Sequence, residues 1–278
     1  MKKNIEKFLY FLVYSNLYLA LGALFVAYIT IFLVNLPMRV EPLFITFSMV
    51  MFAYTLNRLT DVKEDEINVP KRAFFIKKYG KSLLVTSAIL YIIALIITGT
   101  KNLIILFLAS IPILLGFAYS IFKFKRIFVI KNIFVGISWG ILPLITGFFF
   151  GRFDLLILYI AFFIGIEFFI NTVIFDVKDI KGDLLENIRT LPNIFGIRNT
   201  QYVLHILNIL VALSLVLGVF YNILPTIYLL LLFYSFYMFI CIYLLNKNIG
   251  DLFYGIIVDG EFLFMTVVIG LYTVIISF

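Results

Sequence analysis

Two short stretches of the sequence carry side-chain oxygens at helical spacing. Their members are Asn57, Asp61 and Asp65 in the first stretch and Asp176, Asp179 and Asp183 in the second. Intervals of three and four residues place each group on one face of a helix, where stacked carboxylates repel one another. A bound cation relieves that repulsion, and ligands that are all oxygen favour Mg²⁺, Mn²⁺ or Ca²⁺ over zinc or copper.

Basic residues are interleaved with these acids. They are Lys63, Lys71, Arg72, Lys178, Lys181 and Arg189. Because Mg²⁺ keeps few protein ligands and bridges to substrate phosphates, acids and bases together predict a phosphorylated substrate. The apolar surroundings predict that the rest of this substrate is apolar, as in an isoprenoid diphosphate. The alternative is that both stretches are solvated charges flanking membrane helices, and finding two such stacks rather than one disfavours it.

The composition predicts what kind of structure positions these residues. Of the 278 residues, 64% are hydrophobic and 13% are charged, whereas a soluble domain has about 25% charged residues. This balance excludes a soluble globular protein. The single cysteine, Cys241, excludes a disulfide framework, and the single histidine, His205, excludes a His-cluster zinc site.

Apolar runs long enough to cross a bilayer core of about 30 Å divide the chain. They span residues 8–34, 42–59, 83–98, 103–122, 127–150, 153–175, 202–221, 224–245 and 253–278. Their length and lack of strict alternation favour helices over a β-barrel, and the first run is expected to be a retained helix rather than a signal peptide. We therefore expect an all-α integral membrane protein, with nine transmembrane helices in one bundle around a central cavity and one domain over residues 1–278.

The distribution of Lys and Arg predicts the orientation. If the N-terminus is cytoplasmic, every Lys and Arg except Arg39, Lys101 and Arg152 lies on the cytoplasmic side, as the positive-inside rule requires. Nine spans then place the C-terminus outside. The hydrophilic segments 57–81 and 176–200 are expected to be cytoplasmic motif loops, so the polar site would face the cytoplasm from a multi-pass protein of the cell membrane. Topology accounts for the net charge of +7, and no nucleic-acid partner is needed.

The two acidic motifs resemble those of the UbiA-type intramembrane aromatic prenyltransferase superfamily. Residues 57–65 read N-R-L-T-D-V-K-E-D, which is similar to the first motif, NxxxDxxxD. Residues 175–183 read F-D-V-K-D-I-K-G-D and are followed by T-L-P and Gly196, which is similar to the second motif. Y-S-I-F-K at 119–123, with Asn132 after it, resembles the family's Tyr/Lys loop. The resemblance covers essentially the whole chain.

This resemblance implies Mg²⁺-dependent transfer of a prenyl group from an isoprenyl diphosphate to a membrane-associated acceptor, through an allylic carbocation-like state. The implied metal ligands, which would hold two or three Mg²⁺ ions, are the catalytic carboxylates Asp61, Asp65, Asp179 and Asp183 together with Asn57 and Asp176. The positions that match diphosphate-binding residues are Arg72, Lys123, Tyr119 and Arg189.

The acceptor stays open, because the chain departs from the family where the acceptor is expected to bind. Many members have an Arg near the start of the first helix, where this chain has Tyr14-Ser15-Asn16, and an Arg-Glu pair where it has Asn171-Thr172. An aromatic or quinone precursor is favoured, with a glycerol phosphate ether-lipid or tetrapyrrole acceptor as alternatives. Asn171 is expected on the acceptor side.

The roles of several other residues, and the class of the protein, have more than one interpretation. Glu167, one turn from Asn171, is either an acceptor contact or a buried structural acid, and His205 is expected to pack. Tyr54 and Phe175 are expected at the pocket mouth. A cation-coupled transporter is the remote alternative, although transporter sites lie near the bilayer midplane rather than at one surface. Apart from the two substrates and the bilayer, no obligate protein partner is evident.

Overall fold

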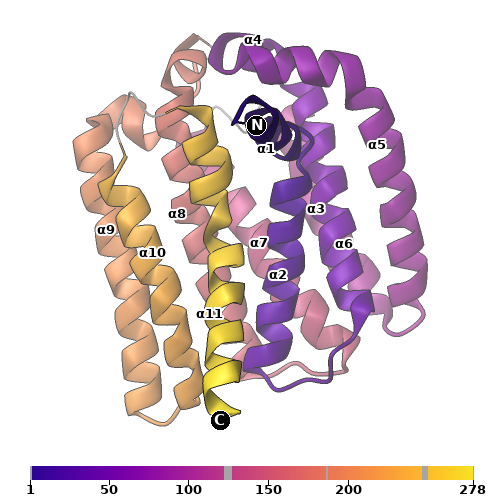
Figure 1. Ribbon diagram of the computed structural model, residues 1–278, viewed down its shortest axis with the longest axis vertical. Coiled ribbons are helices and arrows are strands. Elements are labelled where there is room, and N and C mark those ends of the chain that lie inside the picture. The colour runs from indigo at the N-terminus through magenta and orange to yellow at the C-terminus, as the bar shows by residue number, and fades with distance from the viewer. Residues whose placement is uncertain (1, 122–126, 186, 246–249, 278) are drawn as a thin grey trace.

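The computed structural model describes residues 2–121, 127–185, 187–245 and 250–277, and it contains no strand within these ranges. Figure 1 shows the helices side by side in one bundle, with the short helix α4 at one end and the C-terminus at the other. The elements are α1 (Lys2–Tyr14), α2 (Leu17–Leu33), α3 (Val40–Thr60), α4 (Val62–Asn68), α5 (Pro70–Gly99), α6 (Leu103–Ile121), α7 (Ile130–Phe149), α8 (Leu155–Leu185), α9 (Leu191–Phe220), η2 (Thr226–Leu230), α10 (Leu231–Tyr243), η3 (Phe253–Ile257), η4 (Val258–Gly260) and α11 (Glu261–Ile276).

The number of membrane-crossing helices differs from the expected nine. Seven helices of the described chain are long and apolar enough to cross a bilayer, or eight if α1 and α2 form one broken span. The remaining expected span corresponds to α6, whose described apolar part, Leu103–Gly116, is shorter than the others. The all-helical prediction is confirmed over the described residues, whereas the count of nine is not.

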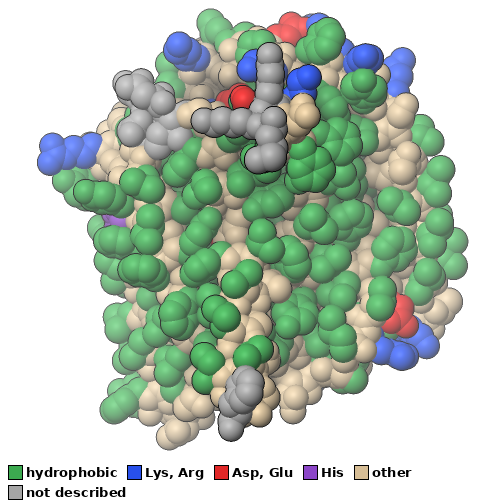
Figure 2. Space-filling view, in the orientation of Figure 1, with side chains coloured by type: hydrophobic (Ala, Val, Ile, Leu, Met, Phe, Trp, Pro, Cys, Tyr) green, Lys and Arg blue, Asp and Glu red, His purple; other side chains and the backbone are tan. Residues whose placement is uncertain are grey.

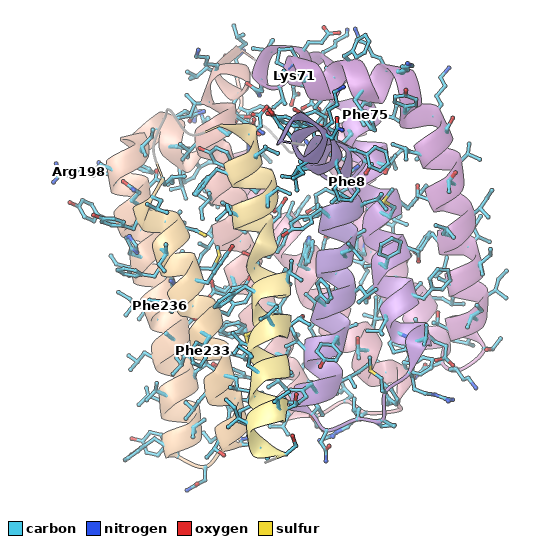
Figure 3. All side chains as sticks on the ribbon, viewed as in Figure 1. Phe8, Lys71, Phe75, Arg198, Phe233 and Phe236 are labelled. Atoms are coloured by element: carbon cyan, nitrogen blue, oxygen red, sulfur yellow. The ribbon has the colours of Figure 1, made fainter. Side chains whose placement is uncertain are left out.

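The first expected span, residues 8–34, was predicted as one helix, which is wrong. The chain bends by 65° between α1 and α2, where Asn16 adopts a left-handed conformation with φ 63°. Asparagine tolerates this backbone better than most residues. The Asn16 side chain also donates a hydrogen bond to Thr55 Oγ1 on α3 at 3.4 Å. The bend therefore brings α1 across the end of the bundle that carries α4, where Phe11 of α1 lies against Phe75 of α5 with ring centroids 6.1 Å apart. Figure 3 labels Phe75 at this end of the bundle.

The two expected motif loops are largely helical. α3 continues to Thr60, and α5 begins at Pro70, where proline suits the first helical turn. α8 extends through the second acidic motif as a 31-residue helix. The sequence of each segment is polar, but a polar segment next to a span can continue that helix when its side chains find partners. The candidate site is therefore held by helix ends rather than by loops.

Glycines let α7 and α8 pack at close range. A Cβ atom on Gly140 would lie 2.9 Å from the Ala161 carbonyl oxygen, and one on Gly136 would lie 2.7 Å from that of Gly165. Such contacts are too short for a side chain, so only glycine permits this approach of the two helices. The close pair sets the positions of the polar residues at the start of α7 and in the second half of α8.

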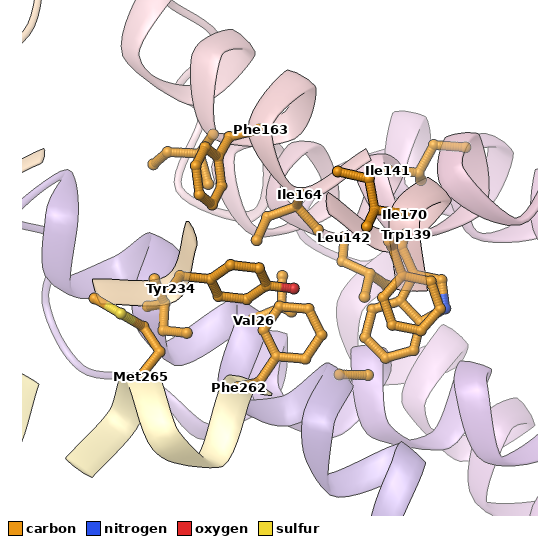
Figure 4. Close-up of a cluster of buried hydrophobic side chains, with 14 of the residues drawn as sticks. Val26, Trp139, Ile141, Leu142, Phe163, Ile164, Ile170, Tyr234, Phe262 and Met265 are labelled. Atoms are coloured by element: carbon orange, nitrogen blue, oxygen red, sulfur yellow. The ribbon is translucent and has the colours of Figure 1, made fainter. Parts of the chain in front are cut away.

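The interior and exterior of the bundle have different side chains. Trp139 stacks on Phe168 with ring centroids 3.6 Å apart and on Phe262 with centroids 5.3 Å apart, and Figure 4 shows Trp139 and Phe262 within the buried cluster. Phe233 and Phe236 of α10 are exposed. Figure 2 shows hydrophobic side chains over the length of the bundle and most of the visible Lys and Arg towards the end with α4. This surface suits a multi-pass membrane protein.

Candidate active site

A cavity of about 230 Å³ lies inside the bundle and has a polar and an apolar part. Its polar lining comes from the C-terminal half of α3, the start of α7, the second half of α8 and the turn before α11. These residues include Asn57, Arg58, Lys131, Asn132, Asn171, Asp176, Asp179 and Asp259. Aromatic side chains line the apolar part, including Tyr54, Trp139, Phe168 and Phe175. Tyr54 and Phe175, which were expected at the pocket mouth, both line this cavity.

The first acidic motif crosses the break between α3 and α4. Asp61 lies at this break, yet the helical hydrogen bonds persist, since Asp61 N donates to Asn57 O and Asp65 N donates to Asp61 O, each at 3.0 Å. Asn57 lines the cavity. Asp65 is only 4% exposed and lies beside the cavity rather than on its wall. The predicted helical register of the motif is therefore correct, although its members have different environments.

Two arginines neutralise Asp65. Arg72 Nε donates to Asp65 Oδ2 at 2.8 Å, its Nη2 donates to Oδ1, and Arg58 Nη1 lies 3.9 Å from Oδ1. Burial acts to raise the pKa of Asp65, but the charges of Arg58 and Arg72 outweigh it and leave the pKa below its ordinary value. Arg72, which was expected to bind the diphosphate, thus holds a motif carboxylate in this structure.

A lysine bridges the second acidic motif. Lys131 Nζ lies 2.8 Å from Asp176 Oδ1 and 2.9 Å from Asp183 Oδ2. Asn132 Nδ2 donates to Asp176 Oδ2 at 3.0 Å. Asp179 also lines the cavity, and its buried Oδ1 atom makes no hydrogen bond. The start of α7 therefore fixes the carboxylates of α8.

The two motifs, far apart in the sequence, lie against each other. Asn68 Oδ1 at the end of α4 accepts a hydrogen bond from Gly182 N on α8 at 2.9 Å. Any side chain at position 182 would collide with Asn68, so glycine is required for this contact. Asn57 of the first motif and Asp179 of the second line the same cavity. The expectation that the motifs share one site agrees with this geometry.

The donor chemistry at this junction fits a divalent cation such as Mg²⁺. Every donor is a carboxylate or amide oxygen, and the unpartnered, buried Oδ1 of Asp179 points to a missing electrostatic partner. Within the described residues, however, no group of three His, Cys, Asp or Glu side chains is already arranged to hold a metal ion. In this structure Arg72 pairs with Asp65, and Lys131 pairs with Asp176 and Asp183.

Several expected site residues lie elsewhere. Glu167 is fully buried and does not line the cavity, and its Oε1 accepts a hydrogen bond from Ser235 Oγ at 3.1 Å. Arg189 is exposed beyond the end of α8. The backbone of Tyr119 belongs to α6, whereas Lys123 lies outside the described residues. Asn171, in contrast, lines the cavity, and its place on the acceptor side stays a prediction.

Three charged residues of the cavity lining had no assigned role in the sequence analysis. Arg58 adjoins Asn57 in the first motif, and its position next to a candidate ligand was the available signal. Lys131 could not be distinguished from its basic neighbours, because its partners lie 45 and 52 positions away on α8. Asp259 is an acid inside the last apolar run, and an intramembrane carboxylate is a functional candidate by default.

Comparisons with known proteins support one family. The model of the UbiA prenyltransferase family matches residues 17–251. A digeranylgeranylglyceryl phosphate synthase of Methanosphaera stadtmanae is 31% identical over 186 residues, which cover 64% of this chain and 65% of that relative, slightly less than two thirds of its length.

Solved structures have the same fold. A UbiA homologue from Aeropyrum pernix K1 without ligand has a TM-score of 0.68 at 14% identity, with 90% of this chain and 97% of that chain covered. A UbiA homologue from Archaeoglobus fulgidus bound to GPP and Mg²⁺ has a TM-score of 0.66 at 15% identity, with 93% and 99% covered. At these identities the similarity to the solved structures concerns the fold alone. The family model, in contrast, matches the sequence itself over residues 17–251. The chain therefore belongs to the UbiA prenyltransferase family.

Proposed function

We propose that the protein transfers a prenyl group from an isoprenyl diphosphate to a glycerol phosphate ether-lipid acceptor in a Mg²⁺-dependent reaction. The observation that carries the proposal is the junction of two acidic motifs beside a cavity with an aromatic wall. Such a site suits a substrate with a diphosphate at one end and an apolar chain at the other. The named activity of the 31%-identical relative supports the acceptor class.

The carboxylates would hold the metal, and the basic residues would meet the phosphates. The proposed metal ligands are Asn57, Asp61, Asp65, Asp176, Asp179 and Asp183. Bound Mg²⁺ would supply charge neutralisation of the diphosphate and help it to leave. Since metal ions would take over the carboxylates, Arg72 and Lys131 could turn from their present partners to the diphosphate oxygens. Lys123, Tyr119 and Arg189 stay in the proposed diphosphate-binding set, and two or three ions remain the proposed number.

The aromatic wall would protect and stabilise the allylic cation. Water would convert such a cation to an alcohol, so transfer needs a dry pocket. Tyr54, Trp139, Phe168 and Phe175 line the cavity, and aromatic faces stabilise a nearby cation by about 0.5–2 kcal/mol each. Trp139 Nε1 donates a hydrogen bond to the Tyr54 hydroxyl at 3.0 Å, which fixes two of these rings. No covalent nucleophile is needed for this chemistry.

The site is proposed to face the cytoplasm. The end of the bundle with α4 carries most of the visible Lys and Arg, and the positive-inside rule assigns that end to the cytoplasmic side. The same end carries the polar part of the cavity. The N-terminus lies at this end and the C-terminus at the other, which agrees with an odd number of crossings.

An aromatic or quinone precursor is the second candidate acceptor. The observation in its favour is the stacked pair Trp139 and Phe168 on the cavity wall, because an aromatic ring could stack there. We rank it second because the 31%-identical relative is named for a glyceryl phosphate product.

An acceptor panel tests the proposal. The purified protein in liposomes would receive labelled geranylgeranyl diphosphate and Mg²⁺ with either a glycerol phosphate that carries one prenyl ether or a prenylatable aromatic acid. We expect labelled product with the glycerol phosphate. Product with the aromatic acid alone would favour the second candidate, and absence of product with both would contradict the proposed function.

A further inference from the structure

An acidic residue at the wall of the cavity, Asp259, is separate from the two acidic motifs. It lies in η4, next to the start of α11, and borders both the main cavity and a smaller space beside it. A carboxylate inside a membrane span costs at least about 2.5 kcal/mol and persists where it has a function.

The backbone around Asp259 is built irregularly. The last span begins with the π-helical turn η3 and the 3-10 turn η4 before regular α11 starts. Hydroxyl groups from neighbouring helices satisfy carbonyl groups of this segment, since Tyr18 donates to Ile256 O at 3.2 Å and Tyr237 donates to Ile257 O. Single π turns within helices occur frequently at functional sites. Here the irregular turns place Asp259 at the cavity.

Asn171 orients Asp259. Its Nδ2 atom donates to Asp259 Oδ1 at 3.4 Å and to Glu261 Oε1 at 3.2 Å. Asn171 is 1% exposed and Glu261 is fully buried, and the second oxygen of Glu261 makes no hydrogen bond. An amide that bridges two carboxylates in this way holds one of them, Asp259, at the cavity and the other behind it.

Cationic side chains lie near Asp259 without pairing with it. The smaller space beside it is also lined by Arg58, Arg72 and Lys178. Within the described part of the chain, no ion pair within 4.0 Å ties up Asp259, whereas Asp65, Asp176 and Asp183 are each held by a cation. Asp259 is therefore a cavity carboxylate outside the two metal-binding motifs that is not already held by a cation, and it can take a proton.

We propose that Asp259, positioned by Asn171, accepts the proton that the acceptor hydroxyl loses during prenyl transfer. This inference rests on the proposed function. The bond between the prenyl carbon and the diphosphate oxygen breaks, and its electron pair leaves with the diphosphate. A lone pair of the acceptor oxygen forms the new bond to that carbon, and the hydroxyl proton passes to the Asp259 carboxylate. The proton then returns to water when the products leave, and no redox partner is required.

The test separates donor ionisation from transfer. Asp259→Asn, Asp259→Glu and a control, Glu41→Gln at the other end of the bundle, would be assayed in liposomes with labelled geranylgeranyl diphosphate, Mg²⁺ and the prenyl-ether glycerol phosphate. We expect Asp259→Asn to lower the kcat of transfer about 100-fold, because a general base contributes a rate factor of about this size. The KM for the acceptor should change little. The variant should still ionise the prenyl donor, so that water captures the prenyl group and diphosphate is released. This remaining activity also shows that the variant is folded. Asp259→Glu should recover part of the transfer rate, and Glu41→Gln should behave as wild type.

Two results would overturn this inference. One is an Asp259→Asn variant that transfers as fast as wild type. The other is a parallel loss of diphosphate release and transfer, since a role in folding or donor binding would produce it. Wild-type protein that releases no diphosphate from any prenyl donor would instead contradict the proposed function itself, and the inference would fail with it.

Discussion

The Lys131 ammonium lies 2.8 Å from Asp176 Oδ1 and so pairs with a carboxylate that we propose as a metal ligand. The lysine comes from the start of α7 and the aspartate from α8, the two helices whose glycines allow a close backbone approach. An internal cation thus neutralises part of the acidic site. When Mg²⁺ and diphosphate bind, the carboxylate would bind the metal ion and the lysine would contact the diphosphate, so stronger electrostatic interactions would replace this ion pair.

Lys131→Met should destabilise the metal-free protein and make Mg²⁺ more stabilising. Removing one partner of a buried ion pair costs about 3–5 kcal/mol, and Mg²⁺ can restore the missing positive charge. Thermal unfolding in detergent, with and without Mg²⁺, measures both effects. Lys131→Arg, which keeps the charge, is the control. An equal Mg²⁺-induced shift in Lys131→Met and wild type would show that the lysine does not stand in for a cation.

Gly140→Ala should lower stability through the α7 and α8 contact. The added Cβ atom would lie 2.9 Å from the Ala161 carbonyl oxygen, so the two helices would separate, at a cost of about 1–3 kcal/mol. Gly270→Ala on α11 is the matched control, because nothing lies within 4 Å of its added Cβ atom. Thermal unfolding should separate the two variants, and equal midpoints would argue against the close packing.

Accessibility tags test the orientation. Tags inserted at residue 70 and residue 190 should both report the cytoplasm, and a tag at the C-terminus should report the outside. The reason is that both acidic motifs and most Lys and Arg lie at one end of the bundle. Labelling of positions 70 and 190 from opposite sides would separate the motifs by a bilayer and exclude a single site.

Much of this architecture could be predicted because its signals are local. Apolar runs predict helices, and the intervals of three and four residues predict that each acidic motif shares a face. Asn57, Asp176 and Asp179 accordingly line one cavity. The bend at Asn16 was missed, since the sequence around it is apolar enough to continue a helix and the left-handed residue is stabilised from α3.

The remaining site residues depend on tertiary contacts. Lys131 gains its role from Asp176 and Asp183, and Asp259 gains its role from Asn171, 88 positions earlier in the chain. Glu167 shows the converse, because a position near Asn171 in sequence suggested the cavity while Ser235 on α10 holds the side chain away from it. Spacing along one helix does not reveal which neighbouring helix a side chain meets.

The central claim is that both acidic motifs form one Mg²⁺-dependent diphosphate site. Its most direct test is Mg²⁺-dependent turnover of labelled geranylgeranyl diphosphate by wild type, Asp61→Ala and Asp183→Ala at matched membrane expression. Asp154→Asn serves as the control, since Asp154 lies at the start of α8, far from the motif. We predict that each alanine variant loses turnover by about 100-fold or more, because each removes a charge from the shared site, and that EDTA abolishes wild-type turnover. Turnover at the wild-type level in either alanine variant would contradict the account.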